Sequence, residues 1–114
     1  MNFTDSLDGD IVHFKLTGKI VSHEDSMTRF HGRMHEYVNL NKKSVIIDLA
    51  KIEQMTSVGL GMLISALTTA RKADGRMVLA NITRIQNLIA ITRLNTVFES
   101  YDSIEEAVKS FKKD

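Results

Sequence analysis

A serine at the start of a helix-forming segment is the residue of this chain best placed for chemistry. Ser57 lies in the stretch 55–61 (Met-Thr-Ser-Val-Gly-Leu-Gly), which follows an apolar run at 45–49 and opens a helical pattern that ends near Ala73. We expect Ser57 to be the N-cap of this helix, exposed and close to unpaired backbone N–H groups. Because the helix dipole and these donors favour an anion, the position tolerates a phosphate. The motif therefore predicts a phosphorylation switch rather than a catalytic centre.

This stretch has three alternative roles. A purely structural Ser57 would only cap the helix, which is worth ~1 kcal/mol. Thr56 is a second hydroxyl beside Ser57 and an alternative phosphate acceptor. A nucleophilic enzyme would need a base beside Ser57, and the sequence has no recognisable Ser-His-Asp order; Met55 also stands where a nucleophile elbow needs glycine. We therefore expect no enzyme and no catalytic residue.

The remaining motifs indicate neither a nucleotide site nor a metal site. Gly59-x-Gly61 is not a dinucleotide fingerprint, because Ile64 occupies the third glycine position, and it lacks the Gly-Lys-Ser/Thr of a P-loop. His31 and His35 have the spacing of a metal pair, but no further ligands of a known zinc pattern accompany them. We therefore expect no metal and no cofactor.

The methionines are expected to fill the core, although one of the two that flank Ser57 could face a partner: Met55 or Met62.

The composition is that of one ordinary globular domain over residues 1–114. Apolar residues make up 43% and charged residues 25% of the chain, and the net charge of +1 gives no bulk attraction for nucleic acid or anionic lipid. There is no cysteine, which is compatible with a reducing compartment. No apolar run approaches the ~20 residues that span a bilayer, and the N-terminus lacks the features of a signal peptide. We therefore expect a cytoplasmic protein without membrane insertion or direct nucleic-acid binding.

Three strands and one helix are expected before the Ser57 helix. Asp8-Gly9 predicts a hairpin between two opening strands, and Gly18 is expected to end the second strand. Ser22 is the expected cap of a first helix, whose apolar positions recur from residue 27 to residue 37 or 38. A short strand over 45–49 then leads into a loop over 50–56. The apolar face of the second strand is expected to carry Val12, Phe14 and Leu16.

The Ser57 helix and the segments after it alternate in the same way. Gly75 is expected to close this helix in a left-handed conformation, and a strand over 77–82 follows. Capping boxes at Thr83–Gln86 and Ser103–Glu106 predict the starts of two further helices, with a short strand over 97–98 between them. The inner stripe of the Ser57 helix is expected to carry Leu60, Leu63, Ile64, Leu67 and Ala70 or Arg71.

Strands and helices therefore alternate after an opening hairpin. Such an order gives a sheet that is parallel over most of its width, with helices packed against it, and the hairpin makes the sheet mixed. We expect a single α/β domain with about five strands and about four helices.

This layout resembles the STAS domain, the fold of bacterial anti-sigma factor antagonists, over nearly the whole chain. The likeness is strongest over 45–49 and 55–64, and the segments 75–81 and 94–107 follow in the order of that family. The family's usual motif is Asp-Ser-Ser-Gly-Leu-Gly, in which the first serine is phosphorylated. Aligned on the glycines, Ser57 stands in the place of that serine, Thr56 in the place of the aspartate and Val58 in the place of the second serine.

The resemblance implies a regulatory binding protein. Its unphosphorylated form would bind a partner that is both anti-sigma factor and serine kinase, which frees the sigma factor for transcription. Phosphorylation at Ser57 would release that partner, and a serine phosphatase would reset the protein. The resemblance also implies partner contacts from Thr56, Ser57, Val58 and Gly59 and from the helix that follows. The alternative is a non-phosphorylated structural subunit of a lipid-transport or stress-signalling assembly.

Overall fold

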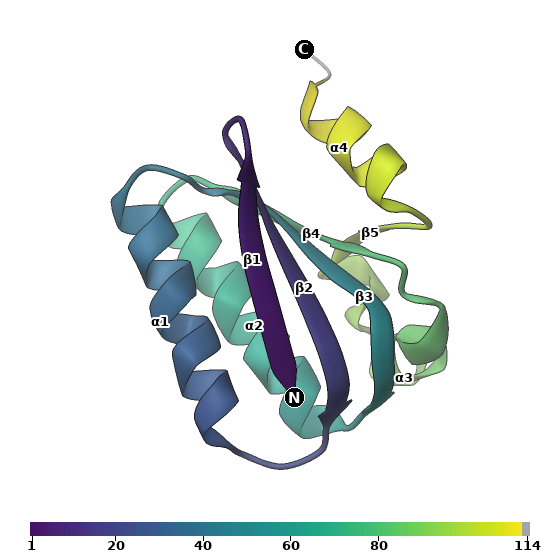
Figure 1. Cartoon of the computed structure of the whole chain (residues 1–114). Helices are drawn as coiled ribbons and strands as arrows, with labels where there is room; N and C mark the ends of the chain where they lie inside the picture. The colour runs from purple at the N-terminus through teal and green to yellow at the C-terminus, as the bar shows by residue number, and fades with distance from the viewer. Residues whose placement is uncertain (113–114) are drawn as a thin grey trace.

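Alternating apolar residues of one strand form the centre of the core. Val12, Phe14 and Leu16 are fully buried on β2 (Ile11–Ile20), as predicted, and the Phe14 ring lies edge-on to the Phe30 ring with 4.9 Å between centroids. The computed structural model describes residues 1–112 (Figure 1). The elements in chain order are β1 (Asn2–Asp8), β2 (Ile11–Ile20), α1 (Asp25–Asn39), β3 (Ser44–Met55), α2 (Ser57–Lys72), β4 (Arg76–Ala80), η1 (Thr83–Ile85), α3 (Gln86–Ile91), η2 (Leu94–Thr96), β5 (Glu99–Tyr101) and α4 (Ile104–Lys112).

The sheet has five strands in the order β1-β2-β3-β4-β5. β1 pairs antiparallel with β2 through the Asp8-Gly9 hairpin, and the other neighbouring strands are parallel. The predicted single α/β domain with a mixed, mostly parallel sheet is therefore confirmed. None of the helices in the described part of the chain is long and apolar enough to cross a membrane.

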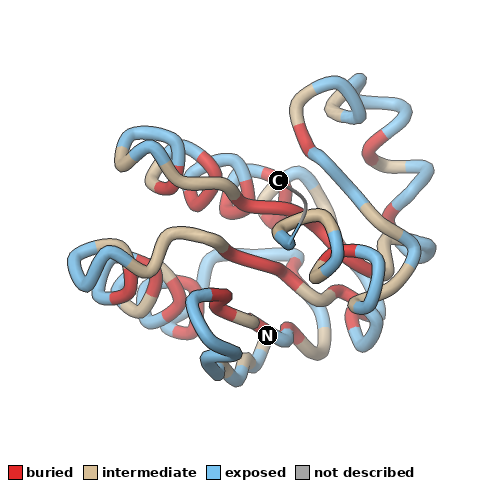
Figure 2. Tube along the Cα trace, turned by 90° about the horizontal axis from the view of Figure 1, so that it is seen from above, coloured by how far each residue is buried: buried red, intermediate tan, exposed pale blue. Residues whose placement is uncertain are grey.

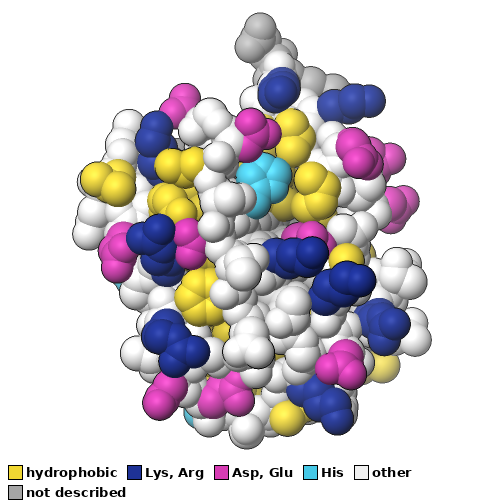
Figure 3. Space-filling model, viewed as in Figure 1, with side chains coloured by type: hydrophobic (Ala, Val, Ile, Leu, Met, Phe, Trp, Pro, Cys, Tyr) yellow, Lys and Arg dark blue, Asp and Glu magenta, His cyan; other side chains and the backbone are white. Residues whose placement is uncertain are grey.

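Helices cover the sheet on both faces. α1 and α2 lie side by side on one face, and α4 lies over part of the other (Figure 1). Buried residues gather where these layers meet (Figure 2). The face that carries α4 has interspersed acidic and basic side chains (Figure 3). The cluster beneath α4 is small and consists of Ile11, Ile46, Val78, Ala80 and Ala107.

Four strands have boundaries that differ from those predicted. β4 spans Arg76–Ala80 and not 77–82, because Asn81 adopts a left-handed conformation with φ +60°. β3 continues through the expected loop over 50–56, because residues as far as Met55 pair with β2. β2 continues past Gly18 to Ile20, with a register shift where Gly18 adopts φ +90°. The last strand spans 99–101 and not 97–98, because the N–H groups of residues 97 and 98 donate back to the carbonyl of Leu94.

Of the three predicted helix starts away from Ser57, one is confirmed. Ser103 Oγ accepts a hydrogen bond from the Glu106 N–H at 3.1 Å. Ser22 does not cap α1: the cap position is Glu24, whose carboxylate accepts a hydrogen bond from the Ser26 hydroxyl at 2.8 Å and none from the helix backbone. The Thr83–Gln86 box does not form either, because a 3₁₀ turn precedes α3.

The end of α2 also differs from its prediction. Asp74, not Gly75, adopts the left-handed conformation, with φ +59°. Gly75 is needed for its small size, because a Cβ there would stand 2.5 Å from the Lys43 carbonyl oxygen. Ile64 is 37% exposed although it was assigned to the inner stripe, and Met62 is buried instead. The other inner positions of α2 are buried as expected: Leu60, Leu63, Leu67 and Ala70.

Candidate functional site

The start of α2 places two adjacent hydroxyls in different roles. Thr56, and not Ser57, is the N-cap: its backbone is extended, with φ −110° and ψ −173°, and its Oγ1 accepts a hydrogen bond from the Val58 N–H at 3.3 Å. The Thr56 N–H donates to the Ile20 carbonyl at 3.1 Å, which extends the contact between β2 and β3 by one residue. Because this contact holds Thr56 in an extended conformation, the helix begins at Ser57, one residue earlier than predicted.

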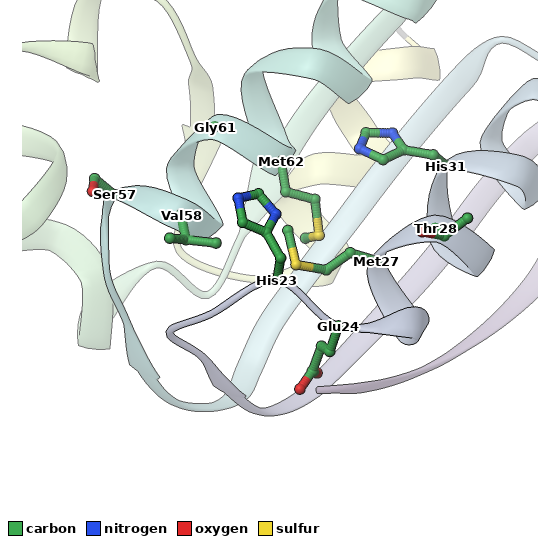
Figure 4. Close-up of a pocket in the computed structure, with 9 residues that line it drawn as sticks. All are labelled: His23, Glu24, Met27, Thr28, His31, Ser57, Val58, Gly61 and Met62. Atoms are coloured by element: carbon green, nitrogen blue, oxygen red, sulfur yellow. The ribbon is translucent and has the colours of Figure 1, made fainter.

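Ser57 is exposed at the first helical position. Its hydroxyl takes part in no side-chain hydrogen bond with the rest of residues 1–112. Figure 4 shows the Ser57 side chain pointing away from the space between the two large helices. The first turn of α2 contains no acidic residue, so no carboxylate opposes an added negative charge there. The hydroxyl is therefore available to another molecule.

The other predicted contact residues lie deeper. Thr56 and Val58 are half-buried, and Gly59 is buried. A Cβ on Gly59 would stand 2.4 Å from Met55 Cγ, so only glycine fits between the helix and the end of β3. Gly61 differs, because it is exposed and a Cβ there would meet nothing within 4 Å. Gly59 thus positions the start of α2. Gly61 has no side chain, so it leaves the surface of α2 near Ser57 uncovered at that position.

A groove of about 440 Å³ lies between the starts of α1 and α2. Val58, Met27 and Met62 project into it, and His23 reaches in from the loop before α1 (Figure 4). Met62 is a groove residue although it is almost fully buried, and Met55 is buried beside Gly59. The full lining is His23, Glu24, Met27, Thr28, His31, Ser57, Val58, Gly61 and Met62.

His31 and His35 lie one helical turn apart on α1 and both face the space toward α2. Burial lowers the pKa of the His31 imidazole, and the neighbouring His35 lowers it further. His35 lines a second cavity of about 550 Å³, farther along the same two helices. Within residues 1–112, no cluster of three or more His, Cys, Asp or Glu side chains could hold a metal ion. The lowered pKa favours the neutral form of the His31 imidazole in the groove wall.

The loop before α1 was not assigned to the site from the sequence. It is brought there by the parallel pairing of β2 with β3, in which Ile20 lies opposite Met55. The carboxyl ends of these two strands therefore lie side by side. His23 follows β2 and Ser57 follows β3, and both residues border the same groove. The signal available in the sequence was the strand order, since two parallel neighbours place their following loops at one edge.

Comparison with known proteins identifies the family and the fold. The STAS domain family matches residues 5–107. A Thermotoga neapolitana protein, provisionally named an anti-sigma factor antagonist homologue, is 25% identical over 75 residues, which span 65% of this chain and just under two thirds (66%) of that protein. A provisionally named anti-sigma factor antagonist from Thermotoga maritima superposes with a TM-score of 0.85 at 18% identity, covering 97% of this chain and 95% of that one.

A third relative is SpoIIAA, described as an anti-sigma factor antagonist. Its unphosphorylated form superposes with a TM-score of 0.78 at 16% identity, covering 98% of this chain and 99% of that one. The phosphorylated form of SpoIIAA from Bacillus gives a TM-score of 0.73 at 16% identity, covering 96% and 98%. At these identities the structural likeness establishes the fold alone.

Proposed function

The chain belongs to the STAS domain family, and we propose that it is a regulatory binding protein switched by phosphorylation at Ser57. In its unphosphorylated form it binds a kinase-type anti-sigma factor and so frees the sigma factor. Phosphorylation of Ser57 by that partner releases it, and a serine phosphatase restores the binding form. Binding and release of the partner take place in the cytoplasm, where transcription is regulated. The printed names of the relatives support the partner class, and SpoIIAA is a fold relative described in both phosphorylation states.

The observation that carries this proposal is the separation of roles between two adjacent hydroxyls. Thr56 is held by the Val58 N–H and caps α2, whereas the Ser57 side chain is exposed and takes part in no side-chain hydrogen bond within residues 1–112. A kinase can therefore modify Ser57 without removing the helix cap. Modification of Thr56 would instead remove an acceptor from the helix start, at a cost of ~1 kcal/mol.

A phosphate on Ser57 changes the surface and leaves the fold in place. It brings a charge of about −1.5 to −2 to the positive end of the α2 dipole, where a negative charge is stabilised by ~0.3–1 kcal/mol. Inside an interface the same group must lose its water, and any carboxylate of the partner repels it. A penalty of ~3 kcal/mol weakens binding more than a hundredfold. The domain therefore releases its partner without a conformational change of its own.

A binding role also fits the surroundings of Ser57 better than nucleophilic catalysis. A serine nucleophile is activated by a base within hydrogen-bond reach. No described residue makes a hydrogen bond to the Ser57 hydroxyl, and that side chain points away from the groove in which His23 and His31 lie (Figure 4). Ser57 is therefore proposed as the acceptor of a phosphoryl group and not as a catalytic residue.

The proposal is tested with the kinase-type anti-sigma factor of the same genome. Incubation with this kinase and ATP, followed by peptide mapping, is expected to place one phosphate on Ser57. Ser57→Ala abolishes it, and the matched control Thr56→Val, which keeps the side-chain shape, leaves Ser57 modified. Phosphate on Thr56, with Ser57→Ala still fully modified, contradicts the assignment. A chain that stays unmodified and copurifies with transporter ATPase subunits supports the structural-subunit alternative.

A further inference from the structure

The segment from Gly75 to Phe98 carries an uneven charge. It contains Arg76, Arg84 and Arg93 and no acidic residue, although the whole chain has a net charge of only +1. Arg76 forms an ion pair, because its Nη2 lies 2.5 Å from the Glu99 carboxylate. Arg84 and Arg93 are exposed, and neither belongs to an ion pair within residues 1–112. Two cations are therefore free on the surface around α3.

An exposed isoleucine lies between these arginines in the sequence. Ile91 at the end of α3 is 80% exposed, more than any other large apolar side chain of the described residues. Its neighbours Asn87 and Ala90 on the outer side of the helix are also exposed, whereas Ile89 is buried in the core. A single exposed apolar side chain is common on protein surfaces, so Ile91 alone indicates nothing. Its combination with two free arginines sets this surface apart.

The backbone at Arg93 is strained. Arg93 adopts φ +61° and ψ +23°, the left-handed region that glycine enters freely and a long side chain enters at a cost. The other non-glycine residues with positive φ in the described chain are the usual types for this region: Asn41, Asp74 and Asn81. A glycine at position 93 would close the same turn without strain. An arginine there thus costs stability, which is the pattern of a residue kept for its side chain.

The α3 region lies at the Ser57 end of the molecule. η1, which carries Arg84, packs against β3, and β3 ends two residues before Ser57. Figure 1 shows α3 and the start of α2 toward the same end of the sheet. A partner that covers Ser57 therefore has Arg84 and the start of α3 within reach of its own surface.

We propose that Arg84, Ile91 and Arg93, here called the α3 surface, dock a protein partner that presents an apolar pocket rimmed by carboxylates. Ile91 fills the pocket, and the two arginines pair with the carboxylates; guanidinium groups suit this role because they bind carboxylates in a bidentate manner. Arginine is among the residue types that dominate the energetics of protein interfaces, in which the central residues fill pockets of the partner. Charge, exposure and the backbone conformation of Arg93 support the docking surface; only the partner's identity as the kinase-type anti-sigma factor rests on the proposed function.

The docking contact also explains how the partner senses the phosphate. A partner that carries carboxylates opposite Arg84 brings negative charge toward the end of the sheet at which α2 starts. Phosphate on Ser57 then repels those carboxylates, since like charges across an interface oppose association. The α3 surface thus selects a partner that phosphorylation of Ser57 can release.

A photo-crosslinking amino acid at position 91 of the full-length chain, expressed in its own cells, tests the surface directly. Position 40 is the matched control, because Leu40 is 69% exposed but follows the end of α1. We expect a crosslinked protein from position 91 and not from position 40, with the attachment mapped to a peptide that contains apolar residues and Asp or Glu. Reversal of both charges in one variant, Arg84→Glu with Arg93→Glu, is expected to abolish the crosslinked product. No product, equal products from both positions, or a product unaffected by the reversal overturns the proposal.

Binding of the purified crosslinked partner then separates this proposal from the phosphorylation switch. Arg93→Gly is expected to keep or raise the melting temperature and to weaken binding at least tenfold, whereas Arg93→Lys, which keeps the charge but loses the bidentate geometry, is expected to weaken binding less than Arg93→Gly does. If Arg93→Gly and Ile91→Ser bind the partner as tightly as the parent chain does, the α3 surface is not a docking site. That conclusion holds irrespective of how Ser57→Asp changes the affinity. If both weaken binding and phosphorylation of Ser57 changes nothing, the α3 surface stands and the proposed switch fails.

Discussion

Met55 lies so close to Gly59 that no side chain fits between them. A Cβ on Gly59 would stand 2.4 Å from Met55 Cγ and 3.1 Å from Ile20 Cβ. The last residue of β3 and the first turn of α2 are therefore in direct contact. This contact fixes the height and direction of the helix start, and with it the position of Ser57, which is two residues before Gly59.

Gly59→Ala is the first prediction. We expect it to lower the free energy of unfolding by up to about 2 kcal/mol, because overpacking costs about 1–3 kcal/mol and alanine regains only ~1 kcal/mol over glycine within a helix. The matched control is Gly61→Ala, whose Cβ meets nothing within 4 Å, so that it is expected to stabilise the protein by up to ~1 kcal/mol. Chemical denaturation of both variants measures the difference. Equal effects of the same sign would show that the contact with Met55 does not matter.

Thr56→Ala is expected to lower the free energy of unfolding by ~1 kcal/mol, because the Val58 N–H loses its acceptor. Thr56→Ser keeps the hydroxyl and most of the stability. Ser57→Ala serves as the control on the adjacent hydroxyl and should change stability by less than ~0.5 kcal/mol, because its side chain takes part in no side-chain hydrogen bond within the described residues. Thermal denaturation of the three variants ranks them by stability. A larger loss of stability for Ser57→Ala than for Thr56→Ala would reverse the assigned roles.

Asp5 is predicted to make stability fall at acid pH. Burial by itself would raise the pKa of the Asp5 carboxyl, but hydrogen bonds from Arg33 and Tyr37 and the charge of Arg33 outweigh it, so the pKa lies below its usual value of about 3.9. The unfolded chain therefore binds the proton more readily. The contribution of Asp5 is fully present above pH ~4 and is lost as the pH falls through the lowered pKa.

Unfolding measured between pH 2 and pH 7 tests this prediction. Asp5→Asn is expected to be less stable than the parent chain at pH 7 and to lose less stability as the pH falls below ~4. The matched control is Asp10→Asn: Asp10 also bonds a cation, Lys42, but is exposed, so its replacement should matter little. Parallel pH curves for the parent chain and Asp5→Asn would show that the carboxylate does not couple α1 to β1.

The order of the elements could be predicted from the sequence, because it depends on apolar spacing within each segment. The strand ends could not, because they depend on partners far along the chain: residues 50–55 are a strand since they pair with β2, and half of them are polar. The same contact places Thr56 rather than Ser57 at the cap. Gly75 was recognised as the helix stop, but its neighbour Asp74 turns the chain, and only the tertiary contact with Lys43 requires glycine.

The final prediction concerns the charge at Ser57. Ser57→Asp places one negative charge at the first position of α2, and we expect it to weaken binding to the kinase-type anti-sigma factor at least tenfold, because the carboxylate must be desolvated in the interface. Ser57→Asn, similar in size but neutral, should keep affinity within about threefold of the parent chain. The Ser57→Asp effect should shrink as salt is raised from 0.05 M to 0.5 M if partner carboxylates cause part of it, since screening weakens their repulsion. Titration calorimetry at both salt concentrations measures this, and equal affinities of Ser57→Asp and Ser57→Asn at low salt would exclude an electrostatic switch.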